Sequence, residues 1–222
     1  MIFDWGGTLT PWHTIDLADF WLTACTSHYA AERAGAIAAA LHAAEISLWQ
    51  RSEREQRSAT LDDLLALAGL EPPSTALLDS YYRVWEPHTF TDPDAPGLLR
   101  DLRRRGIKVG VLSNTMWPRA QHELIFARDG VLDLIDGAVY SSEIPWTKPH
   151  PEAFRAAMAA IGATDPAECV FVGDRLLDDV HGAQQAGLRT VHVPHSDVPP
   201  FGVEPDAVIT RLSDLIEVIG RW

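Results

Sequence analysis

From residue 90 onward, short apolar runs alternate with helical patterns, and this alternation restricts the possible folds more than any other feature. Helical periodicity at 96–105 and 152–161 separates runs rich in β-branched and aromatic residues. These runs are residues 107–112, 138–140, 169–172, 189–193 and 207–209. Continuous apolar strands joined by helices are typical of a parallel sheet covered on both faces. The sequence therefore predicts an α/β protein with a Rossmann-like core.

Residues 14–87 interrupt this alternation, because their apolar residues recur with helical spacing only. One stripe is Leu17, Phe20, Trp21 and Ala24, and Thr60-x-x-Asp63 resembles a capping box that opens a later helix. We expect that helix to stop at Gly69, before Pro72-Pro73. The pattern predicts four helices inserted between a first strand and the rest of the sheet. The predicted domains are thus a core of residues 1–13 and 88–222 and a helical domain of residues 14–87.

Composition and charge narrow the class of protein. The chain has 222 residues, 46% of them apolar, and a net charge of −13. This acidic balance argues against nucleic acid or an anionic membrane as the main partner. No apolar run approaches the roughly 20 residues of a membrane span, and the N-terminus lacks the pattern of a secretory signal. Cys25 and Cys169 stand far apart and are interpreted as free thiols in a reducing compartment, which predicts a cytoplasmic location. The sequence gives no indication of oligomeric state.

Carboxylates follow two of the predicted strands. Asp4 ends the first apolar run, and Met1 stands only three residues before it. The predicted first strand is therefore short, which a longer native N-terminus or a misplaced start would explain. Asp174, Asp178 and Asp179 follow the run 169–172. Ligand sites of open α/β folds lie at the carboxyl ends of strands, and clustered carboxylates suit a hard cation such as Mg²⁺. Each group also has an ordinary structural explanation, as a turn residue or an acidic helix N-terminus.

Groups suited to an anion follow the other strands. Ser113-Asn114 comes directly after the run 107–112 and offers hydroxyl and amide donors. Lys148 lies between prolines in the segment Trp146-Thr-Lys-Pro-His-Pro151, just before a predicted helix, and can act as a point charge on an anion. Turn chemistry and a solvated surface lysine are the alternatives for these residues when each is considered alone.

Taken together, the order and spacing of these groups resemble the motifs of the haloacid dehalogenase-like (HAD) hydrolase superfamily. The resemblance covers the whole chain, and residues 14–87 resemble the helical cap found in one subclass of that family. The residues that carry the motifs are Asp4 and Thr8, then Ser113 and Asn114, then Lys148, then Asp174 and Asp179 in the form Gly-Asp-x₄-Asp.

The resemblance implies a hydrolase that acts on a small, phosphorylated substrate with Mg²⁺. Asp4 would attack phosphorus and form an aspartyl-phosphate that water then hydrolyses. The metal would be held by Asp4, the Gly6 carbonyl and Asp174, while Asp179 would orient its waters or Lys148; neighbouring Asp178 could exchange roles with Asp179. The phosphoryl oxygens would be bound by Thr8, Ser113, Asn114 and Lys148.

One position departs from the pattern of the phosphate-ester hydrolases. Two residues after the nucleophile, those enzymes usually carry an aspartate that protonates the leaving oxygen, and this chain has Gly6. General acid–base catalysis contributes typically 10²–10⁴-fold in rate, so the loss is large. The position leaves the main-chain carbonyl available and removes the acid.

Three hypotheses are consistent with Gly6. The chain could be a phosphatase for substrates with good leaving groups, or one in which another residue, such as His13, replaces the acid. It could belong to the dehalogenase- or phosphonatase-type branches, although residues 14–87 contain no lysine of the kind the phosphonate enzymes take from their cap. It could also be a non-catalytic phosphate-binding or regulatory protein.

Tryptophans flank several of the motifs. We expect Trp5 to pack in the core, because it follows a buried strand. Trp12, Trp117 and Trp146 fall in loops after strands, so we expect them to line the mouth of the pocket. That arrangement would favour a substrate with an apolar or aromatic portion.

Overall fold

The computed structural model describes residues 1–70, 74–194, 197 and 199–222. Six strands and nine α-helices are defined in this part of the chain, joined by short helical turns. In chain order they are β1 (Ile2–Phe3), α1 (Leu17–Thr26), α2 (Ala31–Glu55), α3 (Leu61–Leu67), α4 (Thr75–Trp85), α5 (Ala95–Arg104), β2 (Gly110–Ser113), α6 (Arg119–Arg128), β3 (Gly137–Tyr140), α7 (Pro151–Ala160), β4 (Val170–Gly173), α8 (Gly182–Gln185), β5 (Arg189–His192), β6 (Ala207–Val208) and α9 (Leu215–Ile219).

The strands form a single parallel sheet in the order β3-β2-β1-β4-β5-β6. The first strand lies in the middle, with Ile2 opposite Gly110 on one side and Phe171 on the other. After β1 the chain builds outward to β3, and it then returns to the other side of β1 with β4. The carboxyl ends of β1 and β4 therefore meet where the strand order reverses, which is where such sheets bind ligands.

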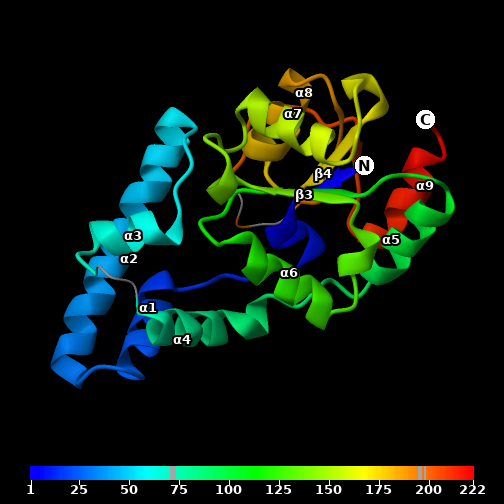
Figure 1. Cartoon of the computed structure of the whole chain (residues 1–222). Helices are drawn as coiled ribbons and strands as arrows, with labels where there is room; N and C mark the ends of the chain where they lie inside the picture. The colour runs from blue at the N-terminus through cyan, green and yellow to red at the C-terminus, as the bar shows by residue number, and fades with distance from the viewer. Residues whose placement is uncertain (71–73, 195–196, 198) are drawn as a thin grey trace.

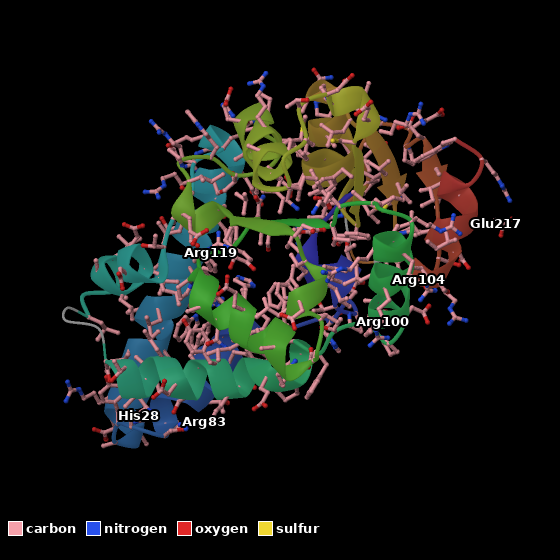
Figure 2. The ribbon with its side chains drawn as sticks, turned by 45° about the vertical axis from the view of Figure 1, so that its right-hand side comes forward. His28, Arg83, Arg100, Arg104, Arg119 and Glu217 are labelled. Carbon is pink, nitrogen blue, oxygen red and sulfur yellow. The ribbon has the colours of Figure 1, made fainter. Side chains whose placement is uncertain are left out.

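Helices cover both faces of the sheet, as the sequence predicts for an α/β fold. On one face, α5, α6 and α9 pack through Leu99, Phe126 and Leu215 onto the sheet. On the other face, α7 and α8 pack onto it through residues such as Phe154 and Ala183 (Figure 1). Charged side chains project outward from the helices, as Arg100 and Arg104 do on α5 (Figure 2).

Helices α1 to α4 lie to one side of the sheet (Figure 1). They pack in a second hydrophobic cluster, which also includes Met116, Trp117 and Ile125. The capping box expected at residue 60 is present, since Thr60 and Asp63 bond to each other's backbone and start α3. The helix stops before Gly69 as expected, while Pro72-Pro73 lie outside the described residues. Among the described helices, none is both long and apolar enough to cross a membrane.

The strands are shorter than the apolar runs that predict them. The run 107–112 becomes β2 only at Gly110, because the neighbouring β1 offers just two residues and Gly110 pairs with the first of them. Residues 107–109 are instead used to leave α5 and to enter the sheet, and the Ile107 amide donates to the Leu102 carbonyl. Apolar character reports burial, whereas strand length depends on the partner strand.

Gly137 allows the close contact between β3 and the end of α7. A Cβ atom at this position would stand 2.3 Å from the main-chain oxygen of Ala160. We expect Gly137→Ala to lower the free energy of unfolding by about 1–3 kcal/mol, the usual cost of overpacking.

Gly97 in α5 is the matched control, because a Cβ atom there meets no atom within 4 Å. Gly97→Ala should raise the free energy of unfolding by roughly 0.5–1 kcal/mol, as expected for replacing a helical glycine. Urea denaturation of both variants measures the difference, and equal midpoints would contradict the packing argument.

Candidate active site

Asp4 stands at the carboxyl end of the central strand. Its amide donates to the Val172 carbonyl at 2.9 Å, which fixes the start of the following turn against β4. The side chain is buried, with 5% of the residue exposed. The fold therefore places a buried carboxylate at the point where the strand order reverses.

The two glycines after Asp4 are not equivalent. Gly7 has φ +83° and a Cβ there would lie 2.8 Å from Asp174 Oδ2, so only glycine allows the turn to approach that carboxylate. Gly6 has φ −74°, which any residue adopts, and a Cβ built on it meets nothing within 4 Å. The missing acid is thus not excluded by the backbone.

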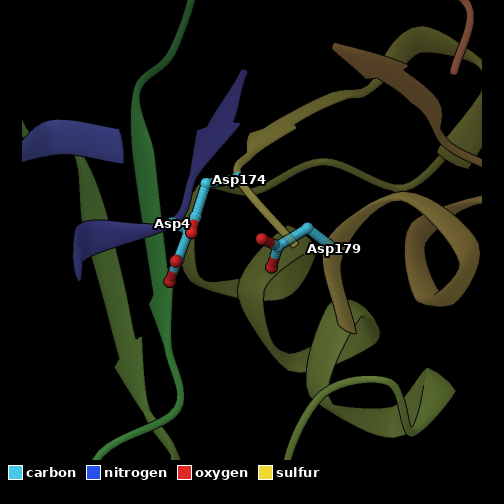
Figure 3. Close-up of side chains that lie close together, drawn as sticks. All are labelled: Asp4, Asp174 and Asp179. Carbon is cyan, nitrogen blue, oxygen red and sulfur yellow. The ribbon is translucent and has the colours of Figure 1, made fainter. Parts of the chain in front are cut away.

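Three carboxylates and one lysine form the centre of the site. Oxygen atoms of Asp4, Asp174 and Asp179 lie within 4.8 Å of one another, and all three residues are buried (Figure 3). Lys148 Nζ donates to Asp4 Oδ1 at 2.7 Å and to Asp179 Oδ1 at 2.6 Å. One buried ammonium faces three carboxylates, so when all three are ionised the buried cluster carries a negative charge that a further cation would offset.

The electrostatics of the cluster follow from its burial. Burial, together with the charges of Asp4 and Asp179, raises the pKa of Asp174 to about 9. Burial alone would lower the pKa of Lys148, but Asp179 and Asp4 outweigh it and the pKa is raised. Asp174 Oδ2 is buried and has no hydrogen-bond partner among the described residues. A buried, unpartnered carboxylate oxygen beside two more carboxylates is the environment that a divalent cation fits.

The predicted phosphate-binding residues occupy different positions in this geometry. Ser113 is buried at the end of β2. Thr8 directs its hydroxyl to Asp174 Oδ1 at 3.5 Å. The Asn114 amide bonds to the backbone of Lys148 in both directions, through Nδ2 to the carbonyl at 2.9 Å and from the Lys148 amide to Oδ1 at 2.8 Å. Asn114 therefore holds the lysine segment in place.

The helical insertion also holds that segment. The end of α2 and the following residues bond to the chain just before Lys148: the Thr147 amide donates to the Gln56 carbonyl at 3.0 Å, and the Ser58 amide donates to the Pro145 carbonyl at 3.2 Å. Ser52 Oγ donates to Thr147 Oγ1 at 3.0 Å. The loop that carries Lys148 is thus fixed from both sides.

The tryptophans divide between interior and site edge. Trp117 is only 6% exposed and packs in the cluster of the helical insertion, so the expectation that it lines an open mouth is wrong. Large aromatic area at the joint between the helices and the core explains its burial. Trp5 is half-buried against Trp117, and Trp146 stacks on His150 at 4.0 Å. Trp12 lies near the carboxylates, since its Cε3 would be 3.1 Å from a Cβ on Gly7.

Two further residues receive definite places. Asp179 belongs to the central cluster, whereas Asp178 points to Arg175, whose nitrogen lies 4.0 Å from Asp178 Oδ2. The sequence alone could not separate these aspartates. Arg175 was not predicted as a site residue, although its position directly after Asp174 is a signal that it must lie at the same strand end. His13 packs edge-on against His88, with ring centroids 4.9 Å apart.

A comparison with family models identifies the class. The model of the haloacid dehalogenase-like hydrolases matches residues 1–187. The chain belongs to this family, in agreement with the six-stranded sheet and the buried Asp4, Lys148 and Asp174.

Individual relatives belong to the same class of enzyme, but each match covers only part of both chains. The chain is 34% identical over 132 residues to glyceraldehyde 3-phosphate phosphatase of Methanopyrus kandleri, covering 57% of this chain and 55% of the relative. It is 35% identical over 127 residues to phosphoserine phosphatase of Thermus thermophilus, a match that covers 57% of this chain and 49% of the relative. The chain thus spans about half the length of these curated relatives.

A solved structure shows the fold over the whole chain. The 2-haloacid dehalogenase of Pseudomonas syringae pv. Tomato DC3000 superimposes with a TM-score of 0.68 at 24% identity, covering 100% of this chain and 97% of the other. At this identity the similarity shows the fold alone.

His122 lies under the loop that follows Ser113. It is fully buried, its Nε2 pairs with Thr115 Oγ1 at 3.3 Å, and its ring stacks on Tyr140 at 4.3 Å. Burial, with a smaller contribution from the Arg119 charge, lowers the pKa of His122 to about 3. The fold therefore keeps this histidine neutral.

This burial predicts an acid-dependent loss of stability. Between pH 6.5 and 3 the unfolded chain binds a proton at His122 that the folded chain refuses, so the free energy of unfolding falls as pH falls. The contribution is about 1.4 kcal/mol per pH unit. In His122→Phe the free energy of unfolding should depend less steeply on pH than in the wild type. The difference in slope should correspond to one proton taken up on unfolding. Tyr140→Phe, which leaves the histidine in place, should keep the wild-type slope; equal slopes in all three proteins would refute the argument.

Proposed function

We propose that this protein is a Mg²⁺-dependent phosphatase that hydrolyses a small phosphorylated metabolite through an aspartyl-phosphate at Asp4. The observation that carries the proposal is the buried group of Asp4, Asp174 and Asp179 around Lys148 at the carboxyl ends of β1 and β4. It combines a nucleophile, a cation site and a fixed positive charge in one place. The phosphatase names of the two curated relatives support the same reaction class.

The described residues fit the metal that the family implies. Asp174 has a buried oxygen without a partner, and Asp4 lies beside it. Asp4, Asp174 and the main-chain carbonyl of Gly6 would hold the ion. Both oxygens of Asp179 already accept bonds, from Lys148 Nζ and from the Arg175 amide at 2.8 Å, so this residue would orient the lysine and the metal's waters. When bound, Mg²⁺ would offset the repulsion between the carboxylate and the phosphate dianion.

The protein groups divide the work of the two steps. An oxygen of Asp4 attacks phosphorus as the bond to the leaving oxygen breaks, which gives an aspartyl-phosphate and the leaving group as its oxyanion, protonated afterwards by water. Water then attacks the acyl phosphate, and inorganic phosphate leaves as the carboxylate of Asp4 is restored. Lys148 holds a phosphoryl oxygen or Asp4 throughout, and the hydroxyls of Ser113 and Thr8 serve as phosphate ligands. Lys148 is kept in position by Asn114 and by the segment after α2.

Gly6 decides which substrates are turned over efficiently. No side chain follows Asp4 at the position where a general acid would protonate the leaving oxygen. A leaving group of low pKa needs no such proton, so aryl and acyl phosphates are favoured over alkyl phosphates. The partner-free carboxylate oxygen of Asp174 supports this reading over metal-free dehalogenation.

A substrate panel tests the role of Asp4 and Gly6 together. With Mg²⁺, turnover of aryl and acyl phosphates should exceed that of alkyl phosphates, and Asp4→Asn should abolish it. Gly6→Asp should raise kcat on alkyl phosphates by about 10²-fold or more, the typical value of general acid catalysis, and a Cβ atom at this position meets no atom within 4 Å.

The outcome separates the remaining hypotheses. No gain from Gly6→Asp, with wild type and Asp4→Asn equally inert, would indicate a non-catalytic phosphate-binding protein. Release of halide from a haloacid without metal would indicate the dehalogenase branch.

Binding of the metal can be measured without turnover. Mg²⁺ should raise the melting temperature, because it binds the folded cluster and not the unfolded chain. Asp174→Asn should remove most of this shift and should itself stabilise the metal-free protein, since it deletes one of three buried carboxylates. The exposed Asp101→Asn is the control and should keep the full shift. A Mg²⁺ shift of the same size in Asp174→Asn would rule out the assigned metal site.

A further inference from the structure

Arg175 is the second cation of the site, and its environment differs from that of Lys148. The lysine side chain is only 2% exposed and is committed to two carboxylates. The Arg175 side chain is 48% exposed, and its ion pair with Asp178 is 4.0 Å long, beyond hydrogen-bond distance. Across the described ranges 1–70, 74–194, 197 and 199–222, no side-chain hydrogen bond involves its guanidinium. A guanidinium with open donors thus stands at the edge of the carboxylate cluster.

The backbone fixes Arg175 next to the reacting groups. It follows Asp174 directly, and its amide donates to Asp179 Oδ2 at 2.8 Å. Burial lowers the pKa of its guanidinium, but the negative charges of Asp174, Asp178, Asp4 and Asp179 outweigh burial and raise that pKa. The guanidinium therefore lies within electrostatic range of the carboxylates at which a phosphoryl group would bind.

Trp12 provides a surface on which the guanidinium rests. The Arg175 carbon Cζ lies 5.9 Å from the centre of the Trp12 ring, the distance of a cation–π contact. The indole is itself held in place, since Nε1 donates to Asp197 Oδ2 at 3.2 Å. A guanidinium stacked on a fixed ring loses less freedom when it binds a ligand than a side chain in open solvent does.

We propose that Arg175 is a specificity-determining residue that binds a second anionic group, a carboxylate or a phosphate, on the leaving group of the substrate. This inference rests on the proposed phosphatase function and narrows its substrate class. The planar fork of arginine matches both anions through paired hydrogen bonds. If the second anion is a phosphate, the proposal also agrees with the absence of an acid at Gly6. A phosphate is a good leaving group and departs without being protonated by a general acid.

Competition against p-nitrophenyl phosphate turnover tests the proposal with matched probes. O-phosphoserine and O-phosphoethanolamine differ only by the carboxylate, and their inhibition constants can be measured even if neither is hydrolysed quickly. A second pair, pyrophosphate and acetyl phosphate, tests a phosphate as the second anion with a good leaving group in both. In at least one pair, the compound with the second anionic group (O-phosphoserine or pyrophosphate) should bind the wild type about tenfold to one-hundred-fold more tightly than its partner, the range expected for one charged hydrogen bond. The pair with the larger ratio identifies the anion.

Variants assign that preference to Arg175. Arg175→Gln should reduce the ratio to near one and leave unchanged the inhibition constants of O-phosphoethanolamine and acetyl phosphate, which lack the second anionic group. Arg175→Lys should restore part of it, because charge remains while the fork is lost. Arg155→Gln, on the exposed face of α7, is the control and should keep the wild-type ratio.

Several results would overturn the inference. They are ratios near one in the wild type, an unchanged ratio in Arg175→Gln, or an equal weakening of all four compounds, which a purely structural arginine would give. Absence of any p-nitrophenyl phosphate turnover by the wild type would instead overturn the proposed phosphatase function. The anion preference is then measured by calorimetric titration of the same compounds in the presence of Mg²⁺, and the ratios are judged by the same criteria.

Discussion

The bonds of one buried ammonium group hold this site together. Lys148 Nζ joins Asp4 at the end of β1 to Asp179 after β4, at 2.7 and 2.6 Å. Buried carboxylates without this partner would carry a high desolvation cost, so loss of the lysine would leave an uncompensated cluster. The lysine segment is held in turn by Asn114, after β2, and by the residues that follow α2. The segments that follow β1, β2 and β4 and the helical insertion are therefore all linked to Lys148.

The same site shows how differently two adjacent glycines can be constrained. Gly7 adopts a left-handed conformation and lies against Asp174, so the backbone requires glycine there. Gly6 has neither restriction, because its φ is −74° and a Cβ atom there meets no atom within 4 Å. The backbone therefore permits a side chain at position 6 and requires glycine at position 7.

Much of the fold could be predicted from the sequence, because most apolar runs correspond to buried strands and the polar groups after them follow strand ends. The last run is the exception, since Val208 in β6 is 56% exposed. The parallel sheet with helices on both faces is confirmed, and so is membership of the hydrolase family. Strand bounds were less accurate, since β1 contributes only two residues and limits the pairing of its neighbours. The burial of Trp117 could not be predicted, because it depends on how the inserted helices pack onto the core. The assignment of Asn114 as a phosphate ligand remains a prediction, and its observed bonds are to Lys148.

The sequence by itself determined the order of chemical groups along the chain: a carboxylate, then small donors, then a lysine, then three more carboxylates, each in the segment that follows a strand. Parallel strands place these groups at one edge of the sheet, and that follows from the pattern. The strand order, which sets β4 beside β1 and so brings Asp174 next to Asp4, is a result of the tertiary structure. Tertiary structure decided which of Asp178 and Asp179 faces the lysine, and it brought Arg175 and Trp12 together at the edge of the site. These outcomes depend on side-chain direction at a turn and on packing between segments more than 150 residues apart, and neither is encoded in local spacing.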